Sequence, residues 1–382
     1  MKRLLIAAVM CLLVSANVLA KESEEFTSGN CKYTILDEGT VEFKLYQGAD
    51  KQFEVPEEIN GYKVTSIGRS AFGFANGLKS IKLPESINNI TANPFMACKN
   101  VSFLISPDHP YLAIIDGALF SKPDKRLICC PDTQENYAVP DGIEIIGESA
   151  FFDCDSMKSI TLPNSVTSIE TAAFLNCDNL SSITLSENLT SLGNAVFSGC
   201  KGLANINLPE SINNVKSNPF FECGNVNCIV SPNHAYFDVV DGVLFSKPDK
   251  RLIYCPNTKE NYAVPDGIET IGDNAFSFCD GLISITLPDS VTSIGDMAFY
   301  GCENLSSITL PDSVTSIGNA SFMGCRSLTN ITLPNSVTNI HDTAFGACDN
   351  LTITVSRDSY AATYCEEHDL SYTYPDANDW LN

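Results

Sequence analysis

The sequence predicts an α/β-solenoid: a right-handed coil with a parallel sheet, about ten 23-residue repeats, two β-hairpin inserts and a cap at each end. A unit of the form I-T-L-P-x-S-V-T-x-I-x-x-x-A/S-F-x-x-C recurs every 23 residues, most regularly over Leu282–Cys348. Each unit contains a short apolar–polar alternation, which is typical of a strand. The period breaks twice, and the two breaks are near copies of each other, 125 residues apart. A fixed period of about 20–50 residues indicates coils that contact only their neighbours.

Residues 1–20 have the pattern of a secretory signal peptide. Lys2 and Arg3 precede the apolar run Leu4–Val14, and Ala20 suits cleavage before Lys21. The apolar run is too short to span a membrane, and no later stretch is long enough to anchor the chain. We therefore expect export, with the protein secreted, held at the cell surface or kept in the periplasm, and no membrane insertion.

Residues 21–70 do not fit the repeat and predict an N-terminal β cap. Cys31–Leu36 and Thr40–Leu45 alternate apolar and polar residues around a turn, which indicates a β-hairpin. Asn60-Gly61 is a second turn signal. The first coil of a solenoid exposes an apolar end, and we expect this segment to cover it.

The repeats occupy residues 71–356. In a segment such as Ser182–Leu185, the Ile and Leu side chains are expected to point inward and the Ser and Thr side chains outward. The proline that follows most of these segments ends the strand, because proline cannot extend a ladder. The A-F-x-x-C piece predicts a short helical or 3₁₀ turn that carries phenylalanine into the core.

The two breaks in the period are predicted to be inserts, at residues 106–140 and 231–265. In each insert, apolar runs flank Ser-Lys-Pro-Asp-Lys, which indicates a β-hairpin with a Pro-Asp turn. Residues 357–382 predict a C-terminal cap and tail. Within this cap, Tyr360–His368 is expected to form a short helix and Ser371–Tyr374 a strand.

The repeat A-F-x-x-C-x-x-L-x-x-I-x-L-P-x-S-V-T-S-I resembles the BspA-like, or Treponema pallidum-type, leucine-rich repeat family. Ile59–Gly68 is similar to the opening of that family, and the D-G-x-L-F-S-K-P-D-K insert also recurs in such proteins. The likeness covers residues 31–374. It implies a curved leucine-rich solenoid on exported proteins of bacteria and some protists, several of them similar to adhesins that bind host matrix proteins or other microbes. The family shares no catalytic or binding residues, so none is carried over.

Nine cysteines lie three residues after a repeat phenylalanine. Equivalent positions of adjacent coils face the same way, so we interpret these cysteines as a structural ladder of buried thiols that bond the neighbouring turn. Disulfides are the alternative in an exported chain, and a metal site is a weaker one, because clustered spacings such as C-x-x-C are missing. The ladder comprises Cys98, Cys154, Cys177, Cys200, Cys223, Cys279, Cys302, Cys325 and Cys348.

Charge and the remaining polar residues point to neither nucleic acid nor a cofactor. The chain carries 23 basic and 46 acidic side chains, and removal of Lys2 and Arg3 with the signal leaves a charge near −25 (21 − 46). Such a surface repels phosphates and anionic membranes. His109 and His234 are copies, interpreted as turn residues bonded to local backbone, with a catalytic or metal role as the alternative. Carboxylates such as Glu303 form either a solvated rim or a calcium-binding one.

Two surfaces are candidates for recognition. Concave solenoid surfaces commonly bind partners, and we expect the outward row of the strands to line that face, although Thr also simply suits exposed strand positions. This row comprises Thr161, Thr184, Asn207, Thr286, Thr309 and Thr332. The second candidate is the pair of basic hairpin loops in an acidic chain, with Lys122, Lys125, Arg126, Lys247, Lys250 and Arg251.

The sequence therefore predicts a secreted, non-enzymatic protein-interaction or adhesion module without a cofactor or metal. Its expected partner is a host matrix protein or another cell-surface protein. An enzyme inhibitor and a structural spacer with no ligand of its own are the alternatives. The sequence names neither the ligand nor the oligomeric state.

Overall fold

The computed structural model describes residues 24–37, 39–73, 75, 77–96, 98 and 100–375. The expected signal peptide at residues 1–20, its cleavage site and the tail at residues 376–382 lie outside the described residues. Within the described part of the chain, no helix has the length and apolar character needed to cross a membrane.

The N-terminal cap is a five-stranded sheet with the order β1-β2-β3-β6-β5. Strands β2 and β3 pair antiparallel, which confirms the predicted hairpin. β3 and β6 run parallel, so the cap already contains the kind of strand pairing that joins the repeats. The strand bounds are β1 Glu25–Ser28, β2 Cys31–Asp37, β3 Thr40–Tyr46, β5 Glu58–Ile59 and β6 Tyr62–Ile67.

The S-I-T segments stack as short parallel strands, which we call the outer ladder. Their register joins equivalent residues of successive coils, such as Thr161 and Thr184. Its members are β4 Gln52–Glu54, β7 Ser80–Lys82, β8 Ser102–Leu104, β12 Asn136–Ala138, β14 Ser159–Thr161, β16 Ser182–Thr184, β18 Asn205–Asn207, β20 Asn227–Ile229, β24 Asn261–Ala263, β26 Ser284–Thr286, β28 Ser307–Thr309, β30 Asn330–Thr332, β32 Thr352–Thr354 and β33 Tyr372–Thr373. Because β4 pairs with β7, this ladder begins inside the segment that the sequence assigned to the cap.

The V-T-S-I segments stack in the same way and form the inner ladder. Each strand is two residues long, and within each half of the chain the strands of adjacent coils pair parallel. Its members are β13 Ile145–Ile146, β15 Ser168–Ile169, β17 Ser191–Leu192, β19 Asn214–Val215, β25 Thr270–Ile271, β27 Ser293–Ile294, β29 Ser316–Ile317 and β31 Asn339–Ile340.

Each insert folds as three antiparallel strands that continue the inner ladder. In the first insert β9 (Leu112–Ile115), β10 (Ala118–Ser121) and β11 (Arg126–Cys129) form the meander, and β11 then pairs parallel with β13. The second insert repeats this arrangement with β21 Phe237–Val240, β22 Val243–Ser246 and β23 Arg251–Tyr254, and β23 pairs with β25. The outermost strands, β9 and β21, are absent from the sequence-based interpretation.

The inserts divide the interior into three hydrophobic cores. On β10, Phe120 packs into the middle core, whereas its neighbour Leu119 packs into the N-terminal core. On β22, Phe245 packs into the C-terminal core and Leu244 into the middle one. All four residues of β10 and of β22 are buried. A strand that is apolar on both faces must be covered on both, so each insert is a partition inside the solenoid.

The A-F-x-x-C segments are turns, and this overturns the helical part of the predicted α/β architecture. Ser149 and Asp153, on either side of Phe151, have φ angles of 55° and 57°. Such left-handed residues interrupt a helix, because its residues all need negative φ. The described residues contain one helix, α2 (Tyr360–Glu367), so the fold is a β-solenoid of stacked parallel coils. The phenylalanine rings still stack, with centroids 4.9–6.0 Å apart within the segments.

The C-terminal cap closes the last coil as expected. The predicted helix over Tyr360–His368 is confirmed as α2, whose N-cap Ser359 accepts a hydrogen bond from the Ala362 backbone N–H. β33 confirms the predicted strand and pairs with β32. Tyr364 of α2 covers Phe345, the last ring of the stack, with centroids 6.4 Å apart.

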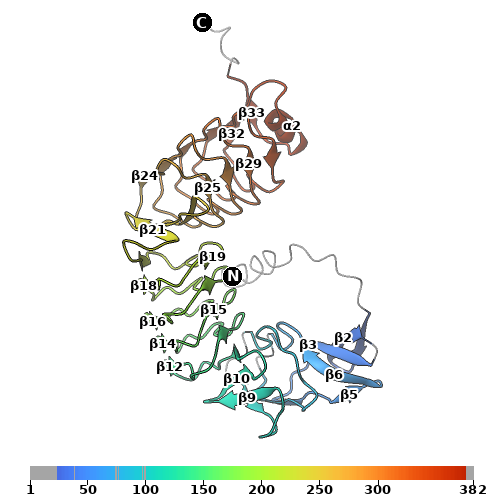
Figure 1. Cartoon of the computed structure of the whole chain (residues 1–382). Coiled ribbons are helices and arrows are strands. Elements are labelled where there is room, and N and C mark those ends of the chain that lie inside the picture. Colours follow the sequence, from blue (N-terminus) through green and yellow to red (C-terminus); the bar gives the residue numbers. More distant parts are fainter. Residues whose placement is uncertain are drawn as a thin grey trace.

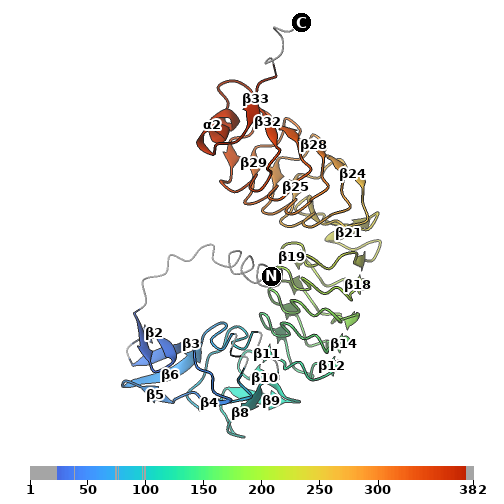
Figure 2. The same cartoon turned by 180° about the vertical axis from the view of Figure 1, so that it is seen from behind.

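The described residues form an open, C-shaped arc (Figure 1). Strands β12, β14, β16, β18 and β24 lie along the outer side of the bend, whereas β15, β19, β25 and β29 lie toward its inner side. The reverse view agrees (Figure 2). The two ladders therefore present different sides of the arc to a partner.

Candidate binding surfaces

The predicted threonine row is exposed and follows the outer ladder. All six of its residues are solvent-exposed at the ends of their strands. The expectation that this row lines the concave face is wrong, because these strands lie on the outer side of the bend (Figures 1 and 2). The physical reason is that each coil has two ladders, and only the three-dimensional curvature decides which of them faces inward.

Two apolar residues interrupt this row, and the sequence reasoning missed them. Leu104 and Ile229 pair in register with Lys82 and Asn207 and are 53% and 45% exposed. Both pairs are 22 residues apart, one fewer than the period, so a search at 23-residue spacing skips them. The strand alternation in S-F-L and N-C-I is the signal that could have found them.

The lysines of the predicted basic loops are already bonded to other groups of the protein. The Lys122 Nζ donates to the His109 carbonyl oxygen at 2.6 Å, and the Lys247 Nζ donates to the His234 carbonyl oxygen at 2.8 Å. Lys125 pairs with Glu144, and Lys250 pairs with Glu269. The loops are exposed, but their cations already have partners.

The two arginines of the loops, which are sequence copies, have different surroundings. Arg126 pairs with Glu170, and the two side chains are 16% and 31% exposed. At the position equivalent to Glu170 the second copy has Gly295, and Arg251 instead donates to the Val215 and Lys216 carbonyl oxygens at 2.9 and 2.8 Å. The duplication therefore preserved the arginine and changed its partner.

The Arg126–Glu170 pair lies in a polar hollow of about 400 Å³ on the inner ladder. Hydroxyl and amide side chains from three successive coils line it, together with Glu148, which pairs with Arg69. These polar residues include Ser168, Ser191 and Asn214. Sequence reasoning selected Arg126 as part of the basic loops but did not identify this surface, although the polar residues of the V-T-S-I alternation could have indicated it.

The nine ladder cysteines each donate a hydrogen bond to a backbone carbonyl oxygen. Seven of them donate from Sγ to the carbonyl oxygen of the phenylalanine of the preceding coil, at 2.7–3.2 Å. The two that follow the inserts, Cys154 and Cys279, donate to the carbonyl oxygens of Cys130 and Cys255 at 3.5 Å. None of the fifteen described cysteines is in a disulfide. Burial raises the pKa of Cys223 to about 12 and that of Cys177 well above its usual value. No group of three or more His, Cys, Asp or Glu side chains among the described residues is arranged to hold a metal ion.

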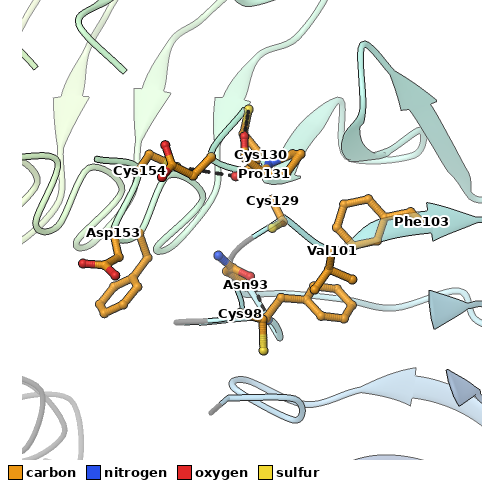
Figure 3. A pocket seen from close by; sticks show the side chains of 12 residues that line it. Asn93, Cys98, Val101, Phe103, Cys129, Cys130, Pro131, Asp153 and Cys154 are labelled. Carbon is orange, nitrogen blue, oxygen red and sulfur yellow. Dashed lines mark hydrogen bonds between the residues drawn. The ribbon is translucent and has the colours of Figure 1, made fainter. Parts of the chain in front are cut away.

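Four cysteines surround a small cavity of about 20 Å³ at the first insert (Figure 3). Cys98 and Cys154 belong to the ladder, and Cys129 and Cys130 come from the end of β11 and the residue after it. In the second copy Tyr254 replaces Cys129. Its hydroxyl accepts from the Val226 N–H at 2.9 Å and donates to the Gly224 carbonyl at 3.2 Å, so this side chain joins the second insert to the coil before it.

The duplicated histidines are structural. The His109 Nδ1 accepts from the backbone N–H groups of Tyr111 and Leu112, at 3.3 and 3.1 Å. Its Nε2 then carries the proton and donates to the Pro84 carbonyl at 3.0 Å. His234 has the corresponding bonds. Both ring nitrogens are occupied, which leaves none to coordinate a metal or to transfer a proton.

The carboxylate rim is partly neutralised by the coils that follow. Asp178 pairs with Lys201, and Glu303 pairs with Arg326, at 3.0 and 3.5 Å. Exposed pairs of this kind contribute little to stability. Both carboxylates therefore have a cationic partner from the next coil.

Comparison with known proteins identifies related folds. A family model described as the BspA type leucine rich repeat region, in six copies, matches residues 51–131, 128–240 and 249–364. The chain is similar to the solved structure of a leucine rich cell surface protein from Faecalibacterium prausnitzii A2-165, with 23% identity, 95% of this chain and 97% of that chain covered, and a TM-score of 0.56.

It is also similar to the pneumococcal vaccine antigen PcpA, with 20% identity, coverage of 93% and 99%, and a TM-score of 0.51. At these identities the likeness describes the fold. No protein with a curated description matches the chain.

Proposed function

Because the chain belongs to the BspA type leucine-rich repeat family, we propose that it is an exported, non-enzymatic module that binds another protein, in the manner of an adhesin. The partner class is a host matrix protein or another protein of a cell surface. The N-terminal sequence Lys2–Ala20 supports export, and the family and the solenoid support binding.

The observation that carries this proposal is the polar hollow on the inner side of the arc. An extended curved surface suits a macromolecular partner, since specific protein interfaces bury about 800 Å² on each side. The inner ladder offers exposed Asn214 and Asn339, together with the carboxylates and hydroxyls of the hollow. Polar groups of this kind fix the register of a partner and set specificity.

The inner ladder is a stronger candidate than either surface chosen from the sequence. The basic loops would have to break existing bonds before their lysines could bind an acidic partner. The threonine row is exposed, but its side chains are small and the row follows the outer side of the bend. Of the residues chosen for those two surfaces, Arg126 alone lines the concave hollow, where it pairs with Glu170.

Matched substitutions in the two halves of the chain test this choice. Asn214 and Asn339 are equivalent inner-ladder residues, and Asn207 and Thr332 are equivalent outer-ladder residues, all of them exposed. The purified chain would be assayed for saturable binding to a panel of matrix proteins and microbial surface proteins. We expect Asn214→Arg with Asn339→Arg to abolish binding, and Asn207→Arg with Thr332→Arg to preserve it.

Other outcomes would redirect or end the proposal. Loss of binding only in the outer-ladder variant would move recognition to the threonine row. Loss only on changing Lys122 and Lys247 to Glu would move it to the hairpin loops. A chain that binds no protein of the panel would contradict the function itself.

A further inference from the structure

The two seven-stranded sheets have four end strands, and within the described residues each end strand has one edge that pairs with no neighbouring strand. These strands are β9 and β19 in the first sheet and β21 and β31 in the second. A free edge presents backbone N–H and C=O groups in the arrangement that another strand needs, so proteins commonly cover it. What covers each edge therefore decides where a second chain can pair.

The edges of β19 and β31 are covered by other segments of the chain. Arg251 donates to the Val215 and Lys216 carbonyl oxygens at the end of β19, at 2.9 and 2.8 Å. Helix α2 contacts β31, and the Tyr364 hydroxyl donates to the His341 carbonyl oxygen just after that strand, at 3.1 Å. An added strand would have to displace these groups.

The edge of β21 is covered by one of its own side chains. The Lys247 N–H donates to the Tyr236 carbonyl, and the antiparallel register then turns the Val239 N–H away from β22, toward the edge. The Asp238 Oδ1 accepts from this N–H at 2.9 Å. This carboxylate takes the place of the acceptor that an added strand would supply.

Strand β9 has the same register without that acceptor. The Lys122 N–H donates to the Tyr111 carbonyl, so Ile114 turns its N–H and C=O away from β10. Ala113 occupies the position equivalent to Asp238, and its methyl group cannot accept a hydrogen bond. Among the described residues, no backbone group outside the β9–β10 pair bonds the Ile114 N–H or C=O. Of the four edges, that of β9 is therefore the one left open.

The open edge carries a row of apolar side chains. Tyr111, Ala113 and Ile115 alternate along the chain and therefore lie on one face of the strand. All three are partly exposed, with 37% for Tyr111 and 39% for Ile115. Figure 1 shows β9 at the lower margin of the arc, below β10. A strand added at this edge would bring its own alternate side chains beside this row.

Carboxylates stand at both ends of β9. Asp108 precedes the strand, Asp116 follows it, and both are exposed. The cations of the adjoining loop have other partners, because Lys122 donates to a backbone carbonyl and Lys125 pairs with Glu144. An added strand with Lys or Arg at its ends is therefore favoured. A second copy of this chain is disfavoured, because it brings the same carboxylates and the same excess of acidic side chains, 46 against 23 basic ones.

We propose that the edge of β9 binds an extended segment of another protein as an added strand, and that this segment has apolar residues at alternate positions and Lys or Arg at its ends. The segment bonds the N–H and C=O of Ile114, and its apolar side chains pack beside Tyr111, Ala113 and Ile115. In this mode the backbone bonds supply affinity and the alternate side chains supply specificity. No residue of β9 lines the inner-ladder hollow, so this proposal goes beyond the binding function proposed above and does not depend on it.

A designed peptide, Lys-Thr-Val-Thr-Val-Thr-Val-Lys with a fluorescent label, tests the proposal by anisotropy titration with the full chain. We expect saturable binding of one peptide per chain. Ala113→Asp and Ala113→Asn each give β9 the acceptor that β21 has, and each should weaken binding about ten-fold through the loss of one backbone bond. The Asn variant adds no charge, so it separates covering of the edge from repulsion.

The second insert supplies the reciprocal test. Asp238→Ala removes the acceptor from β21 and should create a second peptide site on the chain. This site should be the weaker of the two, because Asn233 replaces Asp108 in the second copy. An unchanged midpoint of thermal unfolding shows that each variant keeps its fold.

Two further measurements address the backbone directly. A peptide with the same side chains but with alternate backbone nitrogens methylated cannot donate to the edge, and we expect it not to bind. Hydrogen exchange of the segment that contains Ile114 should slow when the unmodified peptide is added, and should not change with the methylated one.

Several results would overturn the proposal: no saturable binding of the peptide, equal affinity for the methylated peptide, or equal affinity of wild type and Ala113→Asn. Sedimentation velocity tests the other occupant. A wild-type dimer that Ala113→Asn abolishes would assign the edge to a second copy of this chain and contradict the proposed partner. Because the peptide replaces whole partner proteins, this experiment can fail or succeed independently of the assay with the Asn214 and Asn339 variants.

Discussion

Asn93 and Ser149 are 56 residues apart in the sequence and directly bonded in the fold. The Asn93 Nδ2 donates to the Ser149 carbonyl oxygen at 2.8 Å, and its Oδ1 accepts from the Phe95 N–H at 2.8 Å. Asn218 bonds Asn274 in the same way across the second insert. Each asparagine stands before Pro-Phe in the coil that precedes an insert. The edge of the solenoid that carries the phenylalanine turns is therefore continuous past both partitions, although the outer ladder is interrupted there.

We expect Asn93→Ala to lower the free energy of unfolding by about 1–3 kcal/mol, because it leaves the Phe95 N–H without its partner and removes the bond across the insert to the Ser149 carbonyl, which then accepts only from the Phe152 N–H. Urea denaturation measures this change. The matched control is Asn88→Ala, an exposed residue of the same coil, which should change stability by less than about 0.5 kcal/mol. Equal effects of the two substitutions would contradict a bridging role for Asn93.

Tyr254→Phe should destabilise the protein by about 1–3 kcal/mol, since the Val226 N–H and the Gly224 carbonyl lose the hydroxyl that joins them. Tyr262→Phe is the control. Both rings pack against a repeat phenylalanine, at 5.0 Å for Tyr254–Phe220 and 6.2 Å for Tyr262–Phe276. Thermal unfolding of the two variants, compared with wild type, should show a lower midpoint for Tyr254→Phe alone.

The cysteine ladder predicts thiols that are present but protected. Burial raises the pKa of Cys223 to about 12 and that of Cys302 well above its usual value, so the native chain should react slowly with a thiol-specific reagent at neutral pH. After unfolding in denaturant under non-reducing conditions, about fifteen thiols per mature chain should react. A count below about nine would show that disulfides form in the ladder, contrary to its proposed role.

Asp273 predicts a pH-dependent term in stability. Desolvation is the largest cause that raises the pKa of this carboxyl, and Asp296 raises it further, while the bond from the Asp296 N–H lowers it. The folded state therefore binds the proton more tightly than the unfolded state. Stability falls as pH rises from the unfolded pKa through the folded pKa, and the penalty is complete above that range.

Asp273→Asn should remove this penalty. The Asn oxygen can still accept from the Asp296 N–H, as Asn319 already occupies the same row two coils later. We expect the variant to be more stable than wild type at pH 7, by about a few tenths of a kcal/mol because solvent screens the site, and equally stable near pH 3. Asp289→Asn at an exposed corner is the control. Chemical denaturation at the two pH values should show no such pH-dependent difference in stability between this variant and wild type.

The sequence by itself determined the parts of this protein that repeat locally. The 23-residue spacing places Ile, Leu, Phe and Cys at the same point of every coil, so the pairing of one coil with the next follows from a single unit. The N-terminal hairpin and α2 could be predicted for the same reason, since turn residues and apolar spacing within a short segment specify them. The periodicity also led to the BspA type family, which the family model confirms.

The tertiary structure decided which side of the coil faces inward, because curvature sums small rotations over many coils and no single repeat encodes it. It also determined how the inserts pack. β10 and β22 are apolar on both faces and are therefore buried as partitions. The lysines of the loops, which the sequence suggested were free to bind a partner, are bonded to nearby carbonyls and carboxylates. The surroundings of Ser86 follow from the same cause, because its hydroxyl is buried without a hydrogen-bond partner, whereas the equivalent Ser211 donates to the Leu189 carbonyl oxygen. Its hydroxyl lacks an acceptor because the coil before it is the cap, a relationship between distant segments that the repeat pattern does not contain.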